Sequence, residues 1–529
     1  MKTKLLIISV FILGAFASCE RYLETNPKDF TSPENYFNTA QELNSALTGV
    51  YDALGQDGTF GRNLVIELAH GSDEGFYKRD GISLNATPMV YFQTPSDPVI
   101  ISVWRQLYIG INRANYLLAN IDKPLMDSTA RNVIKGEALF LRGFMYFQLA
   151  HLYGEVPLIL TPTVDGDKVD NPKKPLAEVY AQILKDMTDA ELLVNTYAKN
   201  GFPGRVSKTA VQGILARVCL KMAGEPLKDV SKYADAKIWA EKVISSGVHS
   251  LNPSYKQVFI NHSQDLYDIQ FKESIWEIEF FGNNTTTPER EGGRFANQLA
   301  IRNSVIDRGY GYATVGATAT LYRKYQQGDL RRDWNISTFR YSTGASSIGL
   351  GDTVALAASA IHERDAGKWR RYFELVNPKS QDWSPTNFPV LRYSDVLLMY
   401  VEAAIELNDP SDASSVAYKY FNQVRRRAYG FTATGVAPPG LERIPTRQEI
   451  RDERTRELCF EALRKFDLIR WGNFIQTMKT VGQDINLNAP TTLKYAVLGY
   501  NNVSQKHVIL PIPSQELSLN KALKQNSLW

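Results

Sequence analysis

The feature that most constrains this chain is a series of long segments in which apolar residues recur at helical spacing. Residues 131–153 form the strongest of these segments, and Gly154 and Pro157 mark its end. Similar patterns cover 37–54 and 99–121. Apolar residues that recur every three or four positions place one apolar stripe along a helix. The chain is therefore predicted to be mainly α-helical, with these stripes packed against one another.

The helices that follow come in pairs. Helices are predicted over 175–198, 207–223 and 232–246, and a later pair is predicted at 393–407 and 411–428. Small and large residues line up on the facing sides of 207–223 and 232–246, which resembles a tetratricopeptide repeat, a helix–turn–helix unit of about 34 residues. Such pairs stack and bury a continuous core between neighbours. The repeats are degenerate, and a long insertion separates the third pair from the fourth.

The N-terminus has the pattern of an export signal. Lys2 and Lys4 precede an apolar run over 5–16, which is too short to span a membrane, and small residues then precede Cys19. This arrangement resembles the bacterial lipobox, although Phe16 stands where leucine is usual. The resemblance implies cleavage before Cys19 and lipid attachment to its thiol. The alternative is an ordinary signal peptide followed by an incidental cysteine.

Composition limits the remaining classes. The 529-residue chain has a formal net charge of +4 with acids and bases intermixed, so no nucleic-acid-binding patch is indicated. Of its three cysteines, only Cys219 and Cys459 lie beyond the signal region, both in apolar helical contexts. We therefore expect two buried thiols and no disulfide framework.

Residues 270–390 differ from the helical segments. The stretch QFKESIWEIEFFG (270–282) is predicted to contain a strand, and Gly-rich and Ser-rich loops follow it. We expect an irregular second lobe of loops, short strands and short helices. Residues 71–97 are rich in Gly, Asp, Asn and Pro and are predicted to form a long surface loop. Three tryptophans are assigned to the core: Trp104, Trp276 and Trp471.

No catalytic motif emerges. The six histidines form no H-E-x-x-H and no cluster at metal-ligand spacing, and no G-x-S-x-G sequence is present. The Gly-rich stretch 309–316 has Thr314 at the position of the third glycine of the dinucleotide-binding motif, and it lacks the strand–turn–helix context of such a site. The adjacent acids Asp73 and Glu74 could serve a glycosidase, but such pairs are common on loops. We expect no enzyme, no cofactor and no metal site, and a structural calcium ion is not indicated.

Charged residues dominate 450–474, which is predicted to be one helix. Two pairs have the acid four residues before the base: Asp452–Arg456 and Glu461–Lys465. The basic run 425–427 is placed to meet Glu453 and Glu457 from a neighbouring helix. These charges are interpreted as a structural ion network that joins helices.

This charged segment also carries a family resemblance. RTRELCFEALRKFDLIRWG (454–472) closely resembles the C-terminal signature of the SusD/RagB family of outer-membrane nutrient-binding lipoproteins. Four other stretches agree in the family's order: RYLETNPKDF (21–30), EALFLRGFMYFQLAHLYGEVPL (137–158), LRYSDVLLMYVEAA with FNQVRRRA (391–428), and VILPIPSQELSLNKALKQN (508–526). The resemblance spans nearly the whole chain.

The resemblance implies a superhelix of about four tetratricopeptide-like pairs that supports a variable lobe. It also implies a lipid-anchored protein on the outside of the outer membrane that binds oligosaccharides and passes them to a SusC-like TonB-dependent transporter. Part of the family serves peptide or glycopeptide uptake, which is the alternative. The expected divisions are signal peptide 1–18, anchor and tether 19–36, N-terminal helical region 37–265, variable lobe 266–390, and C-terminal region 391–529.

Ligand contacts are expected from loops of the kind that a rigid scaffold positions. Aromatic rings stack on the apolar faces of sugars, and amide, carboxylate and guanidinium groups bond to sugar hydroxyls. The predicted ligand-binding residues are Asp73, Phe76, Tyr77, Arg79, Arg294, Asn297, Tyr310, Tyr312, Trp334 and Trp383. Each of these rings has the alternative role of packing inside its loop or lobe.

Overall fold

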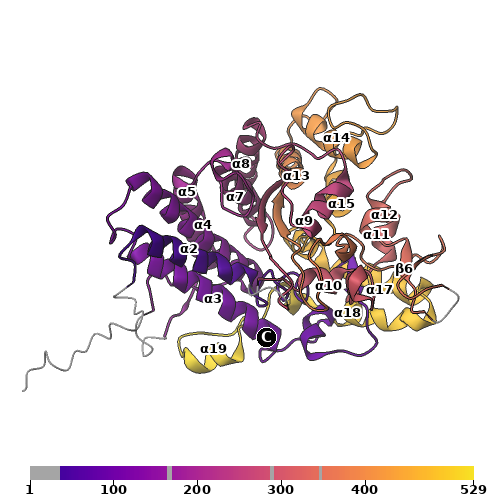
Figure 1. Ribbon diagram of the computed structural model, residues 1–529, viewed down its shortest axis with the longest axis horizontal. Helices are drawn as coiled ribbons and strands as arrows, with labels where there is room; N and C mark the ends of the chain where they lie inside the picture. The colour runs from indigo at the N-terminus through magenta and orange to yellow at the C-terminus, as the bar shows by residue number, and fades with distance from the viewer. Residues whose placement is uncertain (1–35, 164–169, 286–290, 345–347) are drawn as a thin grey trace, which may run out of the picture.

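The computed structural model describes residues 36–163, 170–285, 291–344 and 348–529. Helices make up most of its regular structure, and its strands are short, which confirms the mainly α-helical prediction. In Figure 1 the helices of the N-terminal half lie together on the left, and the short elements of the lobe lie on the right. Within the described ranges no helix is both long and apolar enough to cross a membrane.

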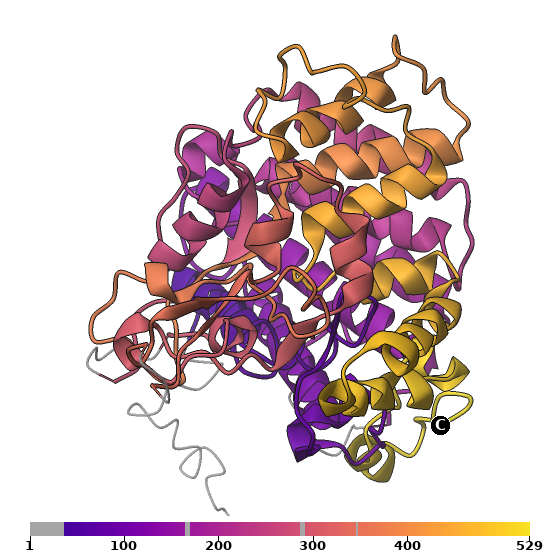
Figure 2. The same ribbon diagram turned by 90° about the vertical axis from the view of Figure 1, so that its right-hand side faces the viewer.

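Eight helices form four consecutive pairs, and the two helices of each pair pack against each other. The pairs are α2 (Ala40–Gly55) with α3 (Pro98–Ala119), α4 (Ser128–Tyr153) with α5 (Leu176–Leu193), α7 (Lys208–Ala223) with α8 (Lys232–Ser245), and α13 (Tyr393–Glu406) with α14 (Val416–Ala428). Consecutive pairs also touch, since α3 contacts α4, α5 contacts α7 and α8 contacts α13. The stack confirms the predicted tetratricopeptide-like superhelix (Figures 1 and 2).

The ends of the first two helices follow from local sequence. Thr39 accepts a hydrogen bond from the Glu42 amide, and the Glu42 carboxylate accepts one from the Thr39 amide, which completes a capping box. Asp97 caps α3 by accepting a bond of 2.8 Å from the Val99 amide, and Pro98 occupies the first helical position. These caps satisfy donors that a helix start would otherwise leave unpaired.

The remaining helices lie outside these four pairs, and most of them are shorter. They are α6 (Tyr197–Asn200), α9 (Tyr255–Gln264), α10 (Phe295–Leu299), α11 (Ala319–Lys324), α12 (Arg332–Asn335), α15 (Arg447–Leu458), α16 (Arg464–Arg470), α17 (Phe474–Asn488), α18 (Leu498–Asn502) and α19 (Ser514–Leu519). In the described part of the chain five 3-10 helices accompany them: η2 (Leu84–Val90), η3 (Ile306–Arg308), η4 (Arg371–Phe373), η5 (Thr491–Val497) and η6 (Gln505–Val508).

The strands form four small antiparallel sheets. They pair β1 (Gly75–Tyr77) with β5 (Val315–Ala317), β2 (Val156–Pro157) with β3 (Lys173–Lys174), β4 (Ser274–Ile278) with β8 (Phe388–Arg392), and β6 (Phe339–Tyr341) with β7 (Thr353–Ala355). Strand β4 confirms the strand predicted within 270–282, and its pairing places Ile278 opposite Phe388. The lobe is therefore tied to the start of the fourth helix pair.

The prediction of a surface loop over 71–97 is wrong at its beginning. Residues 71–77 are buried, because β1 pairs with β5 and the lobe covers it. The composition of this stretch is typical of a surface loop. Composition alone, however, does not show whether another part of the chain will cover a loop.

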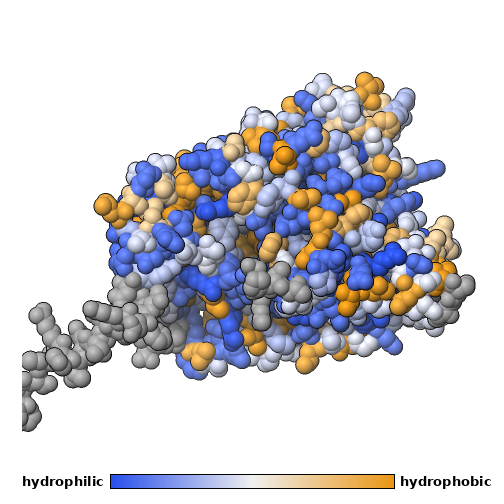
Figure 3. Space-filling view, viewed as in Figure 1, coloured by the Kyte–Doolittle hydropathy of each residue, from blue (hydrophilic) through white to orange (hydrophobic). Residues whose placement is uncertain are grey.

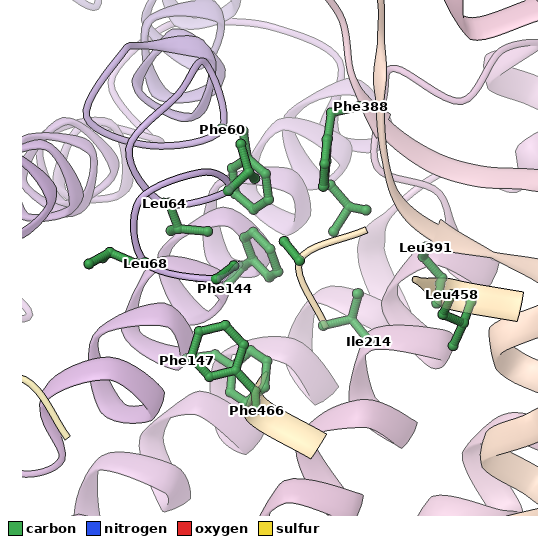
Figure 4. Packing of buried hydrophobic residues seen from close by; sticks show 14 of the residues in the cluster. Phe60, Leu64, Leu68, Phe144, Phe147, Ile214, Phe388, Leu391, Leu458 and Phe466 are labelled. Atoms are coloured by element: carbon green, nitrogen blue, oxygen red, sulfur yellow. The ribbon is translucent and has the colours of Figure 1, made fainter. Parts of the chain in front are cut away.

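One hydrophobic core connects the N-terminal helices to the C-terminal elements. Figure 4 shows Phe60 and Phe144 close to Phe388, and their ring centroids lie 5.9 Å (Phe60–Phe144) and 5.5 Å (Phe60–Phe388) apart. Trp276 is fully buried with its ring edge-to-face on Phe144, and Trp104 is buried as well. Both assignments to the core are confirmed. Trp471 is half-buried at the edge of the cluster, and Cys219 and Cys459 are buried free thiols as predicted.

The prediction of one helix over 450–474 is wrong. Helix α15 ends at Leu458 and α16 begins at Arg464, and Phe460 and Ala462 adopt positive φ angles of 60° between them. The two predicted i,i+4 ion pairs do not form either. Arg456 pairs with Glu453, and the Glu461 carboxylate is turned toward Lys368 and Arg392. Charges from other elements, which sequence spacing does not show, compete successfully for these acids.

The predicted ion network itself is confirmed. Arg425 contacts Glu453 at 3.1 Å, and Arg427 contacts Glu457 at 2.6 Å. Glu457 also accepts bonds of 3.0 Å from Arg331 of the lobe and from Arg392 of β8. Burial by itself would raise the pKa of Glu457, but the three guanidinium groups around it lower that pKa to about 2. The network thus joins α14, α15, β8 and the lobe through paired charges that are buried from solvent.

Candidate functional site

An open cleft with a volume of about 660 Å³ lies between α2 and the lobe. We call it the central cleft. Its lining residues come from α2 and the turn after it, from 202–205, from β4 and the residues after it, and from the 380–384 segment. The ring-bearing members are Tyr51, Phe202, Phe280 and Trp383. On the face shown in Figure 3, hydrophobic residues are scattered among hydrophilic ones, and no single large apolar area dominates.

The wall formed by α2 is held by a buried carboxylate. The Tyr51 hydroxyl donates to Glu137 of α4 at 2.5 Å, and Arg205 donates to both oxygens of the same carboxylate, at 2.8 Å and 3.0 Å. Burial raises the pKa of Glu137 even though the Arg205 guanidinium opposes that change. These bonds fix the Tyr51 ring and the Arg205 guanidinium, so this side of the cleft is preorganised.

The opposite wall carries Glu279, which follows β4. Its carboxylate accepts a bond of 2.6 Å from the Tyr267 hydroxyl, and although the residue is exposed, partial desolvation of the carboxylate together with the neighbouring acids raises its pKa to about 7. Gly204 allows this approach, because a Cβ at that position would lie 2.1 Å from the Glu279 carboxyl carbon. Glu279 therefore gains negative charge in the cleft as the pH rises through neutrality.

Trp383 and Arg294 form the edge of the cleft on the side of the lobe. The Arg294 guanidinium lies 5.1 Å from the Trp383 ring centroid and contacts Asp57 at 3.1 Å. Asn297 is fully buried behind them, where its amide donates to the carbonyl oxygens of Gln381 and Asp382 at 3.2 Å and 2.7 Å. Asn297 thus positions the segment that presents Trp383.

Two tyrosines continue this edge along the surface. Tyr310 and Tyr312 are half-buried and meet edge-to-face with ring centroids 5.0 Å apart. The Tyr312 hydroxyl donates to Asp382 at 2.7 Å, next to Trp383 in the chain. We call Arg294, Tyr310, Tyr312 and Trp383 the aromatic rim.

The structure brings six of the ten predicted ligand-binding residues to this region. They are the four residues of the aromatic rim, Asn297 behind it, and Arg79, whose guanidinium donates to the Ala313 carbonyl at 2.9 Å. The other four lie elsewhere and are buried: Asp73, Phe76, Tyr77 and Trp334. Contact of any of the ten with a ligand stays a prediction.

The four buried residues have partners within the protein. Asp73 forms a bidentate ion pair with Arg464, with both bonds at 2.8 Å. Burial alone would raise the pKa of Asp73, but the Arg464 guanidinium lowers it below its ordinary value. Phe76 and Tyr77 belong to β1, and Trp334 lies under the Arg370 guanidinium at 4.0 Å. Their neighbours therefore account for these side chains without a ligand.

Sequence reasoning missed several groups that line the central cleft. Tyr51 lies within the helical pattern over 37–54, which predicts packing and not a cleft, and Phe202 lies in a short turn with no distinctive pattern. Glu279 belongs to the predicted strand region, but nothing in the sequence indicated that its carboxylate would face α2. In the described part of the chain, no group of three or more His, Cys, Asp or Glu side chains is arranged to hold a metal ion.

Comparison with known protein families shows which family the chain belongs to. A model described as the SusD family matches residues 366–529, and a second, described as "Starch-binding associating with outer membrane", matches residues 21–220. Together they cover more than half of the chain. The chain belongs to the SusD family.

Full-length similarity to other members of the SusD family agrees. SusD-like protein P2 of Formosa agariphila is 26% identical over 536 residues, covering 98% of each chain. The starch-binding protein SusD of Bacteroides thetaiotaomicron is 24% identical, covering 82% of this chain and 79% of its own. A crystal structure of a SusD homolog from B. thetaiotaomicron has a TM-score of 0.83 at 27% identity and covers 94% of this chain and 98% of its own.

The segment that most resembles the SusD family lies away from the central cleft. Residues 454–472 form the end of α15 and the whole of α16, where Arg454, Glu457 and Asp467 are buried in ion pairs. This signature therefore belongs to the scaffold and not to the candidate ligand site. The cleft is lined instead by α2, by 202–205, and by β4 and the residues after it, and the second family model covers α2 and 202–205.

Proposed function

We propose that this protein is a non-catalytic cell-surface protein that binds oligosaccharides in the central cleft and along the aromatic rim. The observation that carries the proposal is Trp383, whose ring stands at the cleft edge beside Arg294 and two surface tyrosines. Rings offer stacking surfaces to the C–H faces of sugars, and the surrounding carboxylate, amide and guanidinium groups suit hydroxyls. The family model described as starch-binding supports this assignment.

We further propose that the protein is lipid-anchored through Cys19 at the outer membrane and faces outward. In this role it passes its ligand to a SusC-like TonB-dependent transporter. The lipobox-like sequence and the description of one family model as associating with the outer membrane support the location. Cys19 lies outside the described residues. The division into tether, helical regions and variable lobe is part of the same proposal.

The charge of the central cleft favours an uncharged glycan. Five acidic residues line it: Asp52, Asp57, Glu277, Glu279 and Glu291. Three arginines near the cleft are already paired: Arg113 with Asp52, Arg205 with Glu137 and Arg294 with Asp57. Among the described residues Glu277, Glu279 and Glu291 have no lysine or arginine partner, and this remaining excess of acid repels sulfated or uronic-acid glycans. Neutral oligosaccharides avoid this repulsion and use the carboxylates as hydrogen-bond acceptors.

The same acidic residues favour one alternative ligand, a basic peptide. Lys and Arg side chains would pair with the carboxylates, and the affinity would rise between pH 6 and pH 8 as Glu279, with its pKa of about 7, becomes ionised. Neutral glycan binding has no charge pair to gain and should change little over that range. The pH dependence therefore separates the two candidates.

Calorimetric titration of residues 20–529 against neutral glycans, acidic glycans and basic peptides tests the proposal. We expect saturable binding to a neutral class with a dissociation constant between about 1 μM and 1 mM. Trp383→Ala should abolish or greatly weaken that binding. Trp239→Ala is the matched control, because Trp239 on α8 also stacks with a cation, Lys242 at 3.8 Å, but does not line the cleft. Equal losses in both variants would contradict the proposed location.

A further inference from the structure

A second cavity shares no lining residue with the central cleft. It has a volume of about 220 Å³ and is lined by residues of α4, α5, α7, α16 and α17, by the residues after α7, and by η6 with the residue after it. Most of its wall is apolar: Leu176, Ile469, Phe474, Ile475, Val508 and Ile509. Pro226 and Gln505 line it too and are exposed, so the cavity reaches solvent at that side.

Two polar groups interrupt this apolar wall. Lys221 of α7 is buried, and its ammonium donates one hydrogen bond of 2.9 Å, to the Glu225 carbonyl. The Tyr180 hydroxyl of α5 is buried and has no hydrogen-bond partner among the described residues. Leaving a buried ammonium or hydroxyl without partners costs free energy, so such groups in a cavity wall point to an absent partner.

The nearby carboxylates do not supply that partner. Glu225 lines the cavity, but its carboxylate pairs with Lys228 at 2.7 Å. Asp467 is held by Arg454 and Arg470, both at 2.9 Å. No carboxylate of the described residues lies within ion-pair distance of the Lys221 ammonium. Burial and the Arg470 charge lower the pKa of Lys221 to about 7, as expected for an ammonium without a counter-ion.

We infer that this cavity is a binding site for a small carboxylate with an apolar tail, separate from the site for the proposed glycan. The carboxylate pairs with the Lys221 ammonium and accepts a hydrogen bond from the Tyr180 hydroxyl, and the tail lies against the apolar wall. His151 also lines the cavity, with its ring centroid 3.7 Å from that of Phe466. Burial and the neighbouring cations hold the pKa of His151 well below its usual value, so it is neutral and adds no competing charge.

An apolar acid suits this site better than a sugar. The wall offers few hydrogen-bonding groups beyond Lys221 and Tyr180, so a polyhydroxylated ligand would lose its hydration without replacement. Each methylene group buried in the apolar wall contributes about 0.8 kcal/mol. A chain of about six carbons fits a cavity of about 220 Å³ and reaches from the polar groups along that wall.

Hexanoate and hexan-1-ol are the probes, titrated by calorimetry into the full-length protein in a non-ionic detergent. We expect hexanoate to saturate one site and hexan-1-ol to bind at least about tenfold more weakly. Lys221→Met should weaken hexanoate binding by at least about tenfold while leaving the thermal midpoint close to wild type. Tyr180→Phe should weaken it about two- to fivefold. Lys185→Met, an exposed lysine on α5, is the matched control and should change nothing.

The pH dependence gives a second readout. Carboxylate binding requires the protonated ammonium, so hexanoate affinity should fall between pH 6 and pH 8.5, and Lys221→Met should remove that dependence. The inference is overturned if hexanoate does not bind to the folded protein, if hexan-1-ol binds equally well, or if Lys221→Met binds hexanoate like the wild type. None of these outcomes depends on whether a glycan occupies the central cleft.

Discussion

The ion network around α15 and the central cleft use the same kinds of side chain for different ends. At Glu457 three guanidinium groups surround one carboxylate, and all four groups are fully buried. In the cleft, Arg294 is half-buried, shares its charge with Asp57 and lies against Trp383. Removing the partner of a fully buried charge is strongly destabilising, whereas a charged group that stays partly hydrated can also bond a ligand. The comparison predicts that substitutions in the network reduce stability and substitutions at the rim reduce affinity.

The largest effect is expected at Glu457. Glu457→Gln leaves Arg331, Arg392 and Arg427 with an uncompensated buried charge, and breaking such a pair costs about 3–5 kcal/mol in free energy of unfolding. Denaturant unfolding measures the change. Glu178→Gln is the control, because its pair with Lys174 is exposed and contributes less than about 1 kcal/mol. Similar losses in free energy of unfolding in the two variants would contradict the claim that buried network charges matter more for stability than surface charges.

Acid should unfold the protein through the same network. The pKa of Glu457 in the folded state is about 2, below its ordinary value of 4.5, so its ionised form stabilises the fold above about pH 4.5. That contribution, roughly 3 kcal/mol for a shift of this size, is lost as the pH falls from about 4.5 toward 2. Unfolding curves at several pH values should show this slope, and Glu457→Gln should flatten it. An unchanged slope in the variant would assign acid sensitivity to other groups.

Two tryptophans sharpen the comparison. Trp383→Ala removes a ring at the cleft edge and should weaken glycan binding by about 10–100-fold with a small loss of stability. Trp334→Ala removes a ring that is 7% exposed, so it should lower the thermal midpoint and leave the affinity of the folded protein within about twofold. Calorimetric titration measures the glycan affinity of both variants, and thermal unfolding measures their stability. The reverse pattern would place the ligand near Trp334.

The smallest effect is expected at Tyr312. Tyr312→Phe keeps the ring and removes the hydroxyl that donates to Asp382, so a hydrogen bond of about 0.5–1.5 kcal/mol is lost. Glycan affinity should fall about two- to tenfold, since the ring remains available for stacking. Tyr312→Ala should cost more than Tyr312→Phe in the same titration. Equal effects would mean that the ring makes no contact with the ligand.

Much of the scaffold could be predicted from the sequence, because periodicity is a local property. The helix predicted at 131–153 is α4, and the strand predicted within 270–282 is β4. The break between α15 and α16 escaped prediction, since the acids of 450–474 bond to Lys368 and Arg392, which are remote in the chain. Spacing along one helix does not reveal which distant charge will reach it.

The candidate site was less accessible to prediction. Aromatic and polar loop composition identified the aromatic rim, but it also selected Asp73, whose carboxylate is buried against Arg464. Nothing local distinguishes a loop that the lobe covers from one that stays in contact with solvent. Tyr51 and Glu279 were missed because their place in the cleft depends on how α2 and β4 come together, which is set by the packing of the whole molecule.

The most direct test of the account is hydrogen–deuterium exchange with and without a saturating concentration of the glycan that binds best. The account predicts slower exchange in 291–297, 310–312 and 380–384 and no change in 454–472. It also predicts that Trp383→Ala removes the protection. Protection confined to helices that do not line the cleft, such as α5, α8 and α14, or to the 454–472 segment, with none at the aromatic rim, would contradict the assignment of the central cleft as the ligand site.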